Sequence, residues 1–507
     1  MLTFLLVIFL TGLYFYIKSI YTYWPRNGFD DIDATFPFGN LDSVRKGLKS
    51  FGCAIQDLYN ATSSPIVGIY LFFRPALLIR DSEIVKNIFT KDFNNFHDRG
   101  IYVDENDQLS ESLFALEGTK WKALRSKLAP SFSSGKIKGM FLASEMVGKQ
   151  MEIYLNSIIP DDKNEKKVID VKDVTYRYAA DIIASTIFGI ETNSFKDKTN
   201  EFFMIKDKIN ENTFFNKLLG MALFLCPQIV KFIPKFIINS NPARKFMVKI
   251  VKETIDFREK NNFVRKDLMQ SLIQLRNTGK INIDDNIWDV ETAAENLKSM
   301  TIEQCAAQAF LFYIAGLETS ASTLAFLLYE LAQNEEIYLK LEKNINETLE
   351  KHNGQITYDS IQEMSYLELC INETMRKYPG LPVLNRICTE DYKIETENVI
   401  IKKGTPIIIS LLGMHRDETY FPEPLKFLPE RFLEDQKNYN ESAYMPFGDG
   451  PRHCIAIRLG KINVKLGAVM ILRKFNIEAI EKKEIEFDNY SVALMPKGGI
   501  NLKLSKK

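Results

Sequence analysis

The sequence predicts a mainly α-helical protein with small β-sheets, folded as one large unit. Apolar residues recur with helical spacing over most of the chain, whereas the short or alternating apolar runs typical of strands are few. After about residue 40 no linker, repeat or low-complexity tract interrupts the pattern. With 46% apolar residues, the 507-residue chain can bury a large core. The predicted helices span residues 118–127, 169–188, 301–333 and 361–378, with another after residue 454, and the predicted strands span residues 65–73, 76–80 and 405–410.

Charge and cysteine content narrow the classes of partner. Lysine plus arginine equals aspartate plus glutamate at 65 each, so no net field draws the protein to nucleic acid. The six cysteines form no CxxC pair and no dense framework, which favours a reducing compartment with free thiols. We therefore expect no nucleic-acid partner and no disulfide scaffold.

The N-terminus has the pattern of a membrane anchor. Leu2 to Ile17 carries no charge, Lys18 is the first basic residue, and tyrosines and Trp24 follow, as at a membrane interface. A cleaved signal peptide is the alternative, but no basic residues precede the apolar run and no small-residue cleavage site follows it. We expect residues 1–24 to be a transmembrane signal anchor with a cytoplasmic C-terminal flank, residues 25–40 a Pro/Gly-containing hinge, and residues 41–507 the folded domain.

A second apolar stretch spans Leu218 to Ile238. It contains two prolines and two lysines, which would be costly across hydrocarbon. A pair of buried helices is one interpretation. The other, which we favour, is an amphipathic segment that rests on the membrane interface.

The run Phe447-Gly-Asp-Gly-Pro-Arg-His-Cys454 has the composition of a ligand-binding loop. Glycines such as Gly450 let the backbone approach a flat ligand closely. Cys454 precedes a predicted helix, whose dipole favours the thiolate, the form in which cysteine binds metals. Arg452 supplies a permanent cation suited to a ligand carboxylate, and His453 is a less suitable metal ligand because adjacent side chains diverge at a turn. Taken alone, an ordinary turn with a buried cysteine would explain the loop equally well.

Two helical pairs add to this loop. Glu373 and Arg376 lie one turn apart, 81 and 78 residues before Cys454, and can form an ion pair on one helix face. Trp121 and Arg125, at i and i+4, can together bind one carboxylate through an indole N–H and a guanidinium. Each pair is a weak motif alone, because such spacings are frequent by chance.

Polar residues interrupt the long apolar helix predicted at 301–333. Ala315 and Thr319 share one face, Gly316 removes bulk beside them, and Glu318 is adjacent. A threonine hydroxyl can donate to the i−4 carbonyl and open a groove in the helix. A packed helix with a satisfied hydroxyl is the alternative, but it explains the adjacent glutamate poorly.

Together these segments resemble the cytochrome P-450 superfamily. The pattern Phe-x-x-Gly-x-Arg-x-Cys, ending at Cys454, is that family's haem loop, and Ala456 stands where the family usually has glycine. Residues 96–100, 116–121, 132–136, 181–185 and 188–189 are similar to insect microsomal enzymes of family 6, and several of these features are shared with family 3.

The resemblance implies a single-domain cytochrome P-450 fold that binds haem b, with Cys454 as the axial thiolate ligand. It implies that Glu373, Arg376 and Arg431 form a network behind the haem loop. It also assigns Thr319 and Glu318 to oxygen activation and proton delivery. The remaining haem-contacting residues that it implies are Trp121, Arg125, Arg386, Arg452, Phe447, Gly450, Ala315 and Gly316.

The implied activity is that of a haem-thiolate monooxygenase. One oxygen atom of O2 enters a lipophilic substrate, such as a plant toxin, an insecticide or an endogenous lipid or hormone, and the other becomes water. The chain has no convincing Rossmann or P-loop motif, so electrons from NADPH must arrive through a separate protein, NADPH–cytochrome P-450 reductase, with cytochrome b5 as a second donor. The implied location is the cytoplasmic side of the endoplasmic reticulum membrane. A haem electron carrier or gas sensor, and a thiolate isomerase that needs no reductase, are the alternatives.

Two surfaces follow from the same resemblance. Residues 101–114 should roof the haem. The predicted substrate contacts are Leu109, Leu113, Phe114, Ala315, Val383 and Val492. The predicted docking surface for the acidic reductase consists of Lys120, Lys122, Lys127, Lys461 and Lys465, although lysines on helices are often simply solvated.

Overall fold

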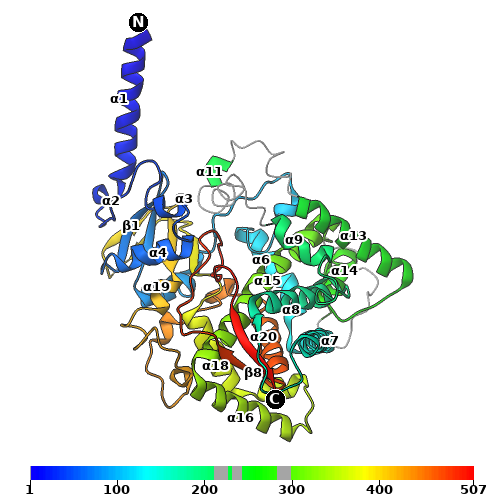
Figure 1. Cartoon of the computed structure of the whole chain (residues 1–507). Helices are drawn as coiled ribbons and strands as arrows, with labels where there is room; N and C mark the ends of the chain where they lie inside the picture. The colour runs from blue at the N-terminus through cyan, green and yellow to red at the C-terminus, as the bar shows by residue number, and fades with distance from the viewer. Residues whose placement is uncertain (1, 210–226, 231–241, 283–298, 395) are drawn as a thin grey trace.

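A computed structural model describes residues 2–209, 227–230, 242–282, 299–394 and 396–507. A large helical part and a smaller part built around β-strands lie side by side, and α1 (Leu2–Tyr21) extends away from both (Figure 1). Each part has its own buried hydrophobic core. The sequence prediction of a mainly helical protein with small sheets is confirmed.

The helices occupy most of the chain. Their bounds are α2 Tyr23–Arg26, α3 Asp42–Arg45, α4 Phe51–Asn60, α5 Ser82–Phe89, α6 Gly118–Leu128, α7 Ser134–Ile158, α8 Val171–Ile183, α9 Glu201–Ile209, α11 Pro227–Val230, α13 Pro242–Asn261, α14 Leu268–Thr278, α15 Ile302–Gln333, α16 Glu335–Lys351, α17 Tyr358–Glu363, α18 Ser365–Lys377, α19 Leu411–His415 and α20 Ile457–Leu472.

Within the described ranges, three small sheets join segments that are distant in sequence. The largest has the order β1-β2-β7-β4, in which β2 pairs with β7 in parallel and the other neighbours are antiparallel. The second has the order β3-β9-β8, and the third pairs β5 with β6. The strands are β1 Ile66–Leu71, β2 Arg74–Ile79, β3 Lys167–Asp170, β4 Val383–Ile387, β5 Tyr392–Ile394, β6 Val399–Ile401, β7 Pro406–Ser410, β8 Phe475–Ala479 and β9 Asn501–Lys506.

Helix α15 is the centre of the helical part. It packs against α8, α13, α18 and α20. It begins with a capping box, in which Thr301 and Gln304 each accept a hydrogen bond from the other's backbone N–H. Among the described residues, α15 is the one helix that is long and apolar enough to span a membrane, but 61% of its apolar window is buried inside the protein. It is a core helix.

Two helix boundaries differ from the sequence prediction. Ile169 belongs to β3, and α8 begins after Asp170, whose side chain accepts a hydrogen bond from the Lys172 N–H. The single helix predicted at 361–378 is two helices, α17 and α18. They are separated at the fully buried Met364, whose ψ of 84° is not helical, so packing of this side chain overrides the helical pattern.

The N-terminal segment packs more closely on the body than its composition indicates. Trp24, expected at a membrane interface, is 2% exposed and donates to the Ile69 carbonyl at 3.1 Å. Only glycine fits beneath its indole at position 68, because a Cβ there would lie 2.3 Å from the ring. The following segment, residues 25–40, exchanges backbone hydrogen bonds with Gly68 and Tyr70 of β1. Most of the stretch predicted to rest on the membrane, residues 218–238, lies outside the described residues.

Candidate functional site

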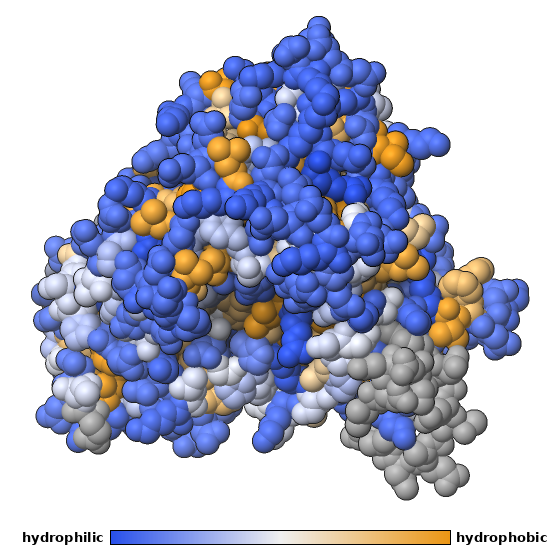
Figure 2. Space-filling view, turned by 90° about the horizontal axis from the view of Figure 1, so that it is seen from below, coloured by the Kyte–Doolittle hydropathy of each residue, from blue (hydrophilic) through white to orange (hydrophobic). Residues whose placement is uncertain are grey.

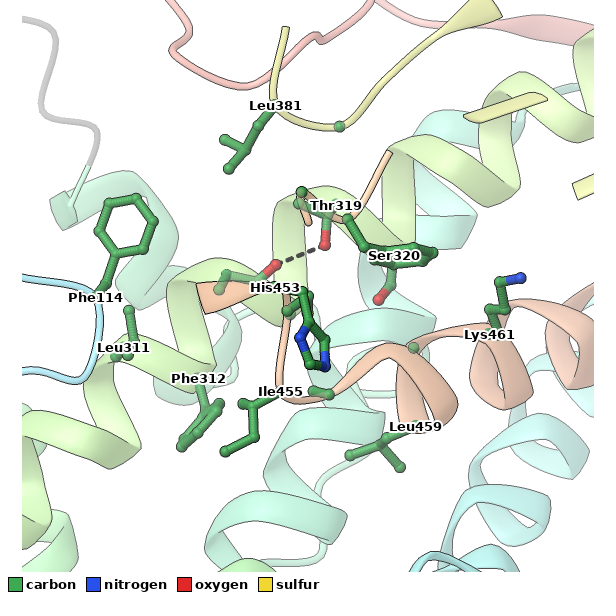
Figure 3. A pocket seen from close by; sticks show the side chains of 18 of the residues that line it. Phe114, Leu311, Phe312, Thr319, Ser320, Leu381, His453, Ile455, Leu459 and Lys461 are labelled. Atoms are coloured by element: carbon green, nitrogen blue, oxygen red, sulfur yellow. Dashed lines mark hydrogen bonds between the residues drawn. The ribbon is translucent and has the colours of Figure 1, made fainter. Parts of the chain in front are cut away.

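A largely apolar cavity lies between α15 and the loop that ends at Cys454. Figure 3 shows the side chains of Leu311, Phe312 and Thr319 from α15 facing those of His453 and Ile455. Leu381 lies beyond Thr319, and Phe114 approaches from a separate loop (Figure 3). The remaining lining residues include Leu113, Trp121, Phe132, Ile182, Ile183, Thr186, Ala315, Gly316, Leu384, Phe447, Cys454, Ala456 and Leu459.

Cys454 is deep in the protein, and its accessible surface faces this cavity. Its backbone N–H donates to the Phe447 carbonyl at 2.9 Å, which closes the loop. Helix α20 begins three residues later, at Ile457. The helix dipole was predicted to favour the thiolate of Cys454, but at this separation its effect does not exceed that of burial. Instead burial raises the pKa of the Cys454 thiol, while the Ala456 N–H and the cations Arg125 and Arg99 act to lower it. A cationic metal in the cavity would complete the stabilisation of the thiolate.

Backbone geometry explains the glycines of this loop and the alanine that follows it. Gly448 and Gly450 have φ of 70° and 66°, and a Cβ at Gly450 would lie 1.7 Å from the Phe89 carbonyl oxygen. Ala456, where the family usually has glycine, has φ of −102° and ψ of 22°. This conformation is open to any residue, so alanine fits here without backbone strain.

Four arginines gather beside Cys454 along the cavity: Arg99, Arg125, Arg386 and Arg452. Burial and the charge of Arg452 lower the pKa of Arg99 to about 9. Burial and the charges of Arg99 and Arg452 lower the pKa of Arg386. Burial likewise lowers the pKa of Arg452 to about 10, and Arg125 repels it further. The group therefore carries an excess of buried positive charge.

Contacts within the protein compensate these cations only in part. Arg452 donates to the Leu116 carbonyl at 2.6 Å and lies 3.5 Å from the Asp98 carboxylate, and its guanidinium stacks on the Trp121 ring at 4.3 Å. Arg386 stacks on Phe89 at 4.4 Å. The Nε atoms of Arg386 and Arg452 are buried without a hydrogen-bond partner. The carboxylates of haem propionates would satisfy such donors, so these residues fit the implied group.

Sequence reasoning missed Arg99. It lies in the segment 96–100, which resembles family 6 enzymes. Its guanidinium stacks on Phe114 at 4.2 Å and lies 3.5 Å from the Asn385 side-chain oxygen, which brings it next to Arg386. The signal was a lone arginine before a glycine in an otherwise ordinary loop, and only the fold shows that it joins the other three.

Thr319 has the predicted local geometry. Its hydroxyl donates to the Ala315 carbonyl at 2.6 Å, and both residues line the cavity, as the dashed line in Figure 3 shows. Gly316 lies alongside, where a Cβ would come within 3.2 Å of Ile183. Glu318 is not among the described residues that line the cavity. It lies near Tyr176, whose pKa is raised by burial and by the negative charge of Glu318.

The Glu373 carboxylate is buried between two guanidinium groups. Arg376 donates to it at 2.7 and 2.9 Å, and Arg431 at 3.2 Å. All three side chains are at most 1% exposed. The Nη1 atom of Arg376 donates to the His415 carbonyl at 2.7 Å. His415 returns a hydrogen bond from Nδ1 to the Arg376 carbonyl, and its Nε2 accepts from the Met445 N–H. Burial and the charge of Arg376 lower the pKa of His415 to about 3.

Three of the six predicted substrate contacts lie outside the described cavity lining. Leu113, Phe114 and Ala315 line the cavity, whereas Leu109, Val383 and Val492 do not. Val383 is adjacent to Leu384 on β4, and successive side chains of a strand point to opposite faces. Leu384 and Arg386 therefore face the cavity together and Val383 faces away. Leu109 is buried in the helical core, and Val492 is 55% exposed on a surface turn.

Part of the predicted lysine surface is not exposed. The Lys465 side chain is only 4% exposed and pairs with Glu368 at 3.0 Å. Lys461 pairs with the same carboxylate at 2.5 Å. These two lysines share a face of α20 that is turned toward α18, which periodicity alone did not show. Lys120 and Lys122 on α6 are exposed, and Lys127 is half-buried.

Comparison with known proteins identifies the family. The cytochrome P450 family matches residues 36–504. The chain is 50% identical over 506 residues to a probable cytochrome P450 6d5 of Drosophila melanogaster, with 99% of each chain covered. It is 50% identical over 518 residues to cytochrome P450 6d3 of Musca domestica, covering 100% of this chain and 99% of the relative. Cytochrome P450 6k1 of Blattella germanica is 39% identical over 515 residues, covering 99% and 96%.

The members of this family are monooxygenases that use haem with a thiolate ligand, O2 and electrons derived from NADPH. The cavity of this chain provides one cysteine at a glycine-rich loop, a cluster of buried arginines and a threonine groove on the facing helix. Sequence and geometry therefore agree, and the chain belongs to the cytochrome P450 family and, with its insect relatives, to family 6.

Proposed function

We propose that this chain oxidises lipophilic substrates, such as plant toxins, insecticides or endogenous lipids, inside the cavity beside Cys454. One observation carries the proposal: apolar side chains of α8, α15 and β4 enclose the same space onto which Cys454 and the Ala315–Thr319 groove open. Such a space excludes water from the reaction and binds substrates by burial of apolar surface.

Each wall of the cavity has a separate role in this proposal. Cys454 ligates the haem iron, and the Ala456 N–H holds the sulfur in place. Trp121 and the four arginines bind the propionates, which neutralises the buried cations. Phe447, Gly450, Ala315 and Gly316 bound the space that the ring occupies. When bound, the haem supplies the oxygen-activating chemistry.

Thr319 controls a proton on the substrate side. Its hydroxyl donates to the Ala315 carbonyl, so its oxygen lone pairs are directed away from the helix and can accept a hydrogen bond in the cavity. Rotation of the hydroxyl turns its O–H bond from the Ala315 carbonyl toward the cavity, where it can donate a hydrogen bond. Glu318, one residue earlier and not among the described residues that line the cavity, supplies the proton that replaces one given up by Thr319.

The sequence and the orientation of α1 support a membrane location. Residues 1–24 serve as a signal anchor, and the side chains of Phe4, Leu5 and Ile8 in α1 are more than half exposed. The face of the molecule seen from below, opposite α1, is largely hydrophilic over its described residues (Figure 2). Residues 25–40 link the anchor to the domain of residues 41–507, which lies on the cytoplasmic side of the endoplasmic reticulum.

Electrons reach the haem from NADPH–cytochrome P-450 reductase, with cytochrome b5 as a second donor. Lys120, Lys122 and Lys127 on α6 support this part of the proposal. The same helix carries Trp121 and Arg125, so a partner bound to its outer face would lie close to the propionate side of the cavity.

Turnover with purified reductase tests the proposal. A panel of lipophilic compounds should give oxygenated products only when NADPH, reductase and O2 are all present. Thr319→Ala should retain haem but consume NADPH with little product, because the cavity loses its hydroxyl. Ser322→Ala is the matched control, since Ser322 on the same helix donates to the Glu318 carbonyl at 2.7 Å but does not line the cavity. Product formation without reductase, or unchanged coupling in Thr319→Ala, would contradict the proposal.

A further inference from the structure

The loop that covers the cavity is attached to α15 by polar side chains far from Thr319. Leu113 and Phe114 of this loop both line the cavity, and Figure 3 shows Phe114 beside Leu311 of α15. Neither residue is part of α6 or α15. The height of this roof, meaning the distance of Leu113 and Phe114 from the rest of the cavity, therefore depends on the contacts that hold the loop in place.

Gln308 provides the central attachment. It is 0% exposed in an otherwise apolar stretch of α15. Its Oε1 accepts from the Leu113 N–H at 2.9 Å, and its Nε2 donates to the Glu111 carbonyl at 2.8 Å. A buried amide is costly unless both ends are hydrogen-bonded, and here the backbone of the loop satisfies both.

Neighbouring contacts extend the attachment in both directions. Gln304 donates to the Glu111 carboxylate at 2.9 Å, and the Thr301 hydroxyl donates to the Gln108 side chain at 2.7 Å. Thr301, Gln304 and Gln308 are spaced i, i+3 and i+7, so they share one face of α15. At the other end of the loop, Arg452 donates to the Leu116 carbonyl. The roof is therefore held between α15 and the Cys454 loop.

We infer that Gln308 is a positioning residue that sets the height of the cavity roof and thereby the length of ligand that the cavity accepts. This inference rests on the proposed function, because it assigns a substrate-size preference to the same cavity. Gln308 does not itself line the cavity and lies eleven residues before Thr319, about 16 Å along the helix. It acts through Leu113 and Phe114.

The variant Gln308→Leu removes both hydrogen bonds to the loop, at the Leu113 N–H and the Glu111 carbonyl, and keeps a similar side-chain volume. Suitable probes are 1-methylimidazole and 1-octylimidazole, whose ring nitrogen binds the haem iron while the alkyl chain extends through the cavity. Their dissociation constants follow from the change in haem absorption. We expect 1-methylimidazole to bind as in the wild type, and the ratio of the two constants to change by roughly fivefold or more, since two loop groups lose their partners.

Two further variants separate positioning from a general loss of stability. Gln270→Leu is the matched control, because Gln270 is a buried glutamine of α14 that bonds Arg258 at 3.2 Å, away from the cavity. It should leave the ratio unchanged. Gln308→Glu should keep a ratio close to that of the wild type, because a carboxyl buried against the Glu111 carbonyl is protonated and can both accept from the Leu113 N–H and donate to that carbonyl. A wild-type ratio in Gln308→Leu would overturn the inference.

Hydrogen exchange gives a readout that needs neither ligand nor turnover. In the purified full chain the Leu113 amide should exchange slowly, and faster in Gln308→Leu but not in Gln270→Leu. Unchanged exchange at this amide would also overturn the inference. A wild-type protein that binds both imidazoles but oxygenates no substrate would instead contradict the proposed function, and the measured ratio would still decide the role of Gln308.

Discussion

Two groups of buried arginines differ in how their charge is compensated. Arg376 and Arg431 share the Glu373 carboxylate and donate their remaining protons to backbone carbonyls. Along the cavity, Arg99 and Arg386 repel each other, and the Nε atom of Arg386 has no partner. The first group is compensated within the chain, whereas the second lacks a compensating anion among the described residues. We therefore expect the first group to stabilise the fold and the second to bind the haem propionates.

The largest expected effect is the loss of Glu373. Glu373→Gln removes the charge that two buried guanidinium groups share, and breaking such a network costs about 3–5 kcal/mol. We expect a protein that unfolds at much lower urea concentration and takes up little haem. Glu430→Gln is the control, since this carboxylate is partly exposed and pairs with Lys340 at 3.0 Å, so its removal should cost about 1 kcal/mol or less. Equal losses of stability in the two variants would contradict the claim that the Glu373 network stabilises the fold more than an exposed ion pair does.

The second expected effect has the opposite sign for the polypeptide. Arg386→Met removes one of the mutually repelling cations, so the haem-free chain should be at least as stable as the wild type. Haem should dissociate roughly tenfold faster or more, because a charge-assisted hydrogen bond is lost. Urea unfolding of the haem-free protein and haem transfer to an acceptor protein measure the two quantities. This prediction would be contradicted if Arg386→Met destabilised the haem-free chain as much as Arg431→Met does.

The third expected effect is a pH dependence of the unfolding free energy. It arises at His415, which is hydrogen-bonded to Arg376 of the first group. Because the pKa of His415 falls from 6.5 in the unfolded chain to about 3 in the folded one, only the unfolded chain takes up a proton between these values. Stability is thus fully present above pH 6.5 and declines as the pH falls toward 3, by at most about 1.4 kcal/mol per pH unit. His415→Asn should flatten the profile of unfolding free energy against pH. An unchanged slope in His415→Asn would count against the buried neutral imidazole.

The smallest expected effect is the stabilisation of the haem-free protein by a simple anion that binds the cavity arginines. Millimolar phosphate should stabilise the haem-free protein by about 1 kcal/mol or less relative to chloride at equal ionic strength, because it binds the folded state through these cations. The increment should shrink in Arg386→Met, which removes one of these cations. Thermal unfolding in the two salts measures it. A phosphate effect that is the same in the wild type and Arg386→Met would show that the cluster is not the anion site.

The difference between the two groups also explains what the sequence could predict. Glu373 and Arg376 are neighbours on one helix, and the Cys454 loop is a continuous run, so local spacing indicates both. Thr319 and its i−4 carbonyl are equally local. The arginines of the cavity come from four separate segments, and Arg99 has no local pattern that marks it. Its role depends on the pairing of distant segments, which spacing does not contain.

Errors in the sequence prediction came from the orientation of elements rather than from their existence. Val383 was expected to line the cavity, but it lies on β4, where the next residue, Leu384, faces the cavity instead. Lys465 was assigned to the surface, but α20 turns that face toward Glu368. Trp24 was assigned to a membrane interface, but Gly68 leaves a space in which its indole is buried. Each error is a question of which face packs inward, and long-range packing decides it.

The most direct test of the central claim is the absorption spectrum of the reduced protein under carbon monoxide. If Cys454 is the thiolate ligand of a haem held by the cavity arginines, the wild type should show the absorption of a thiolate-ligated haem, and Cys454→Ser should lose it. A histidine-like spectrum in the wild type that survives the Cys454→Ser substitution would contradict the claim.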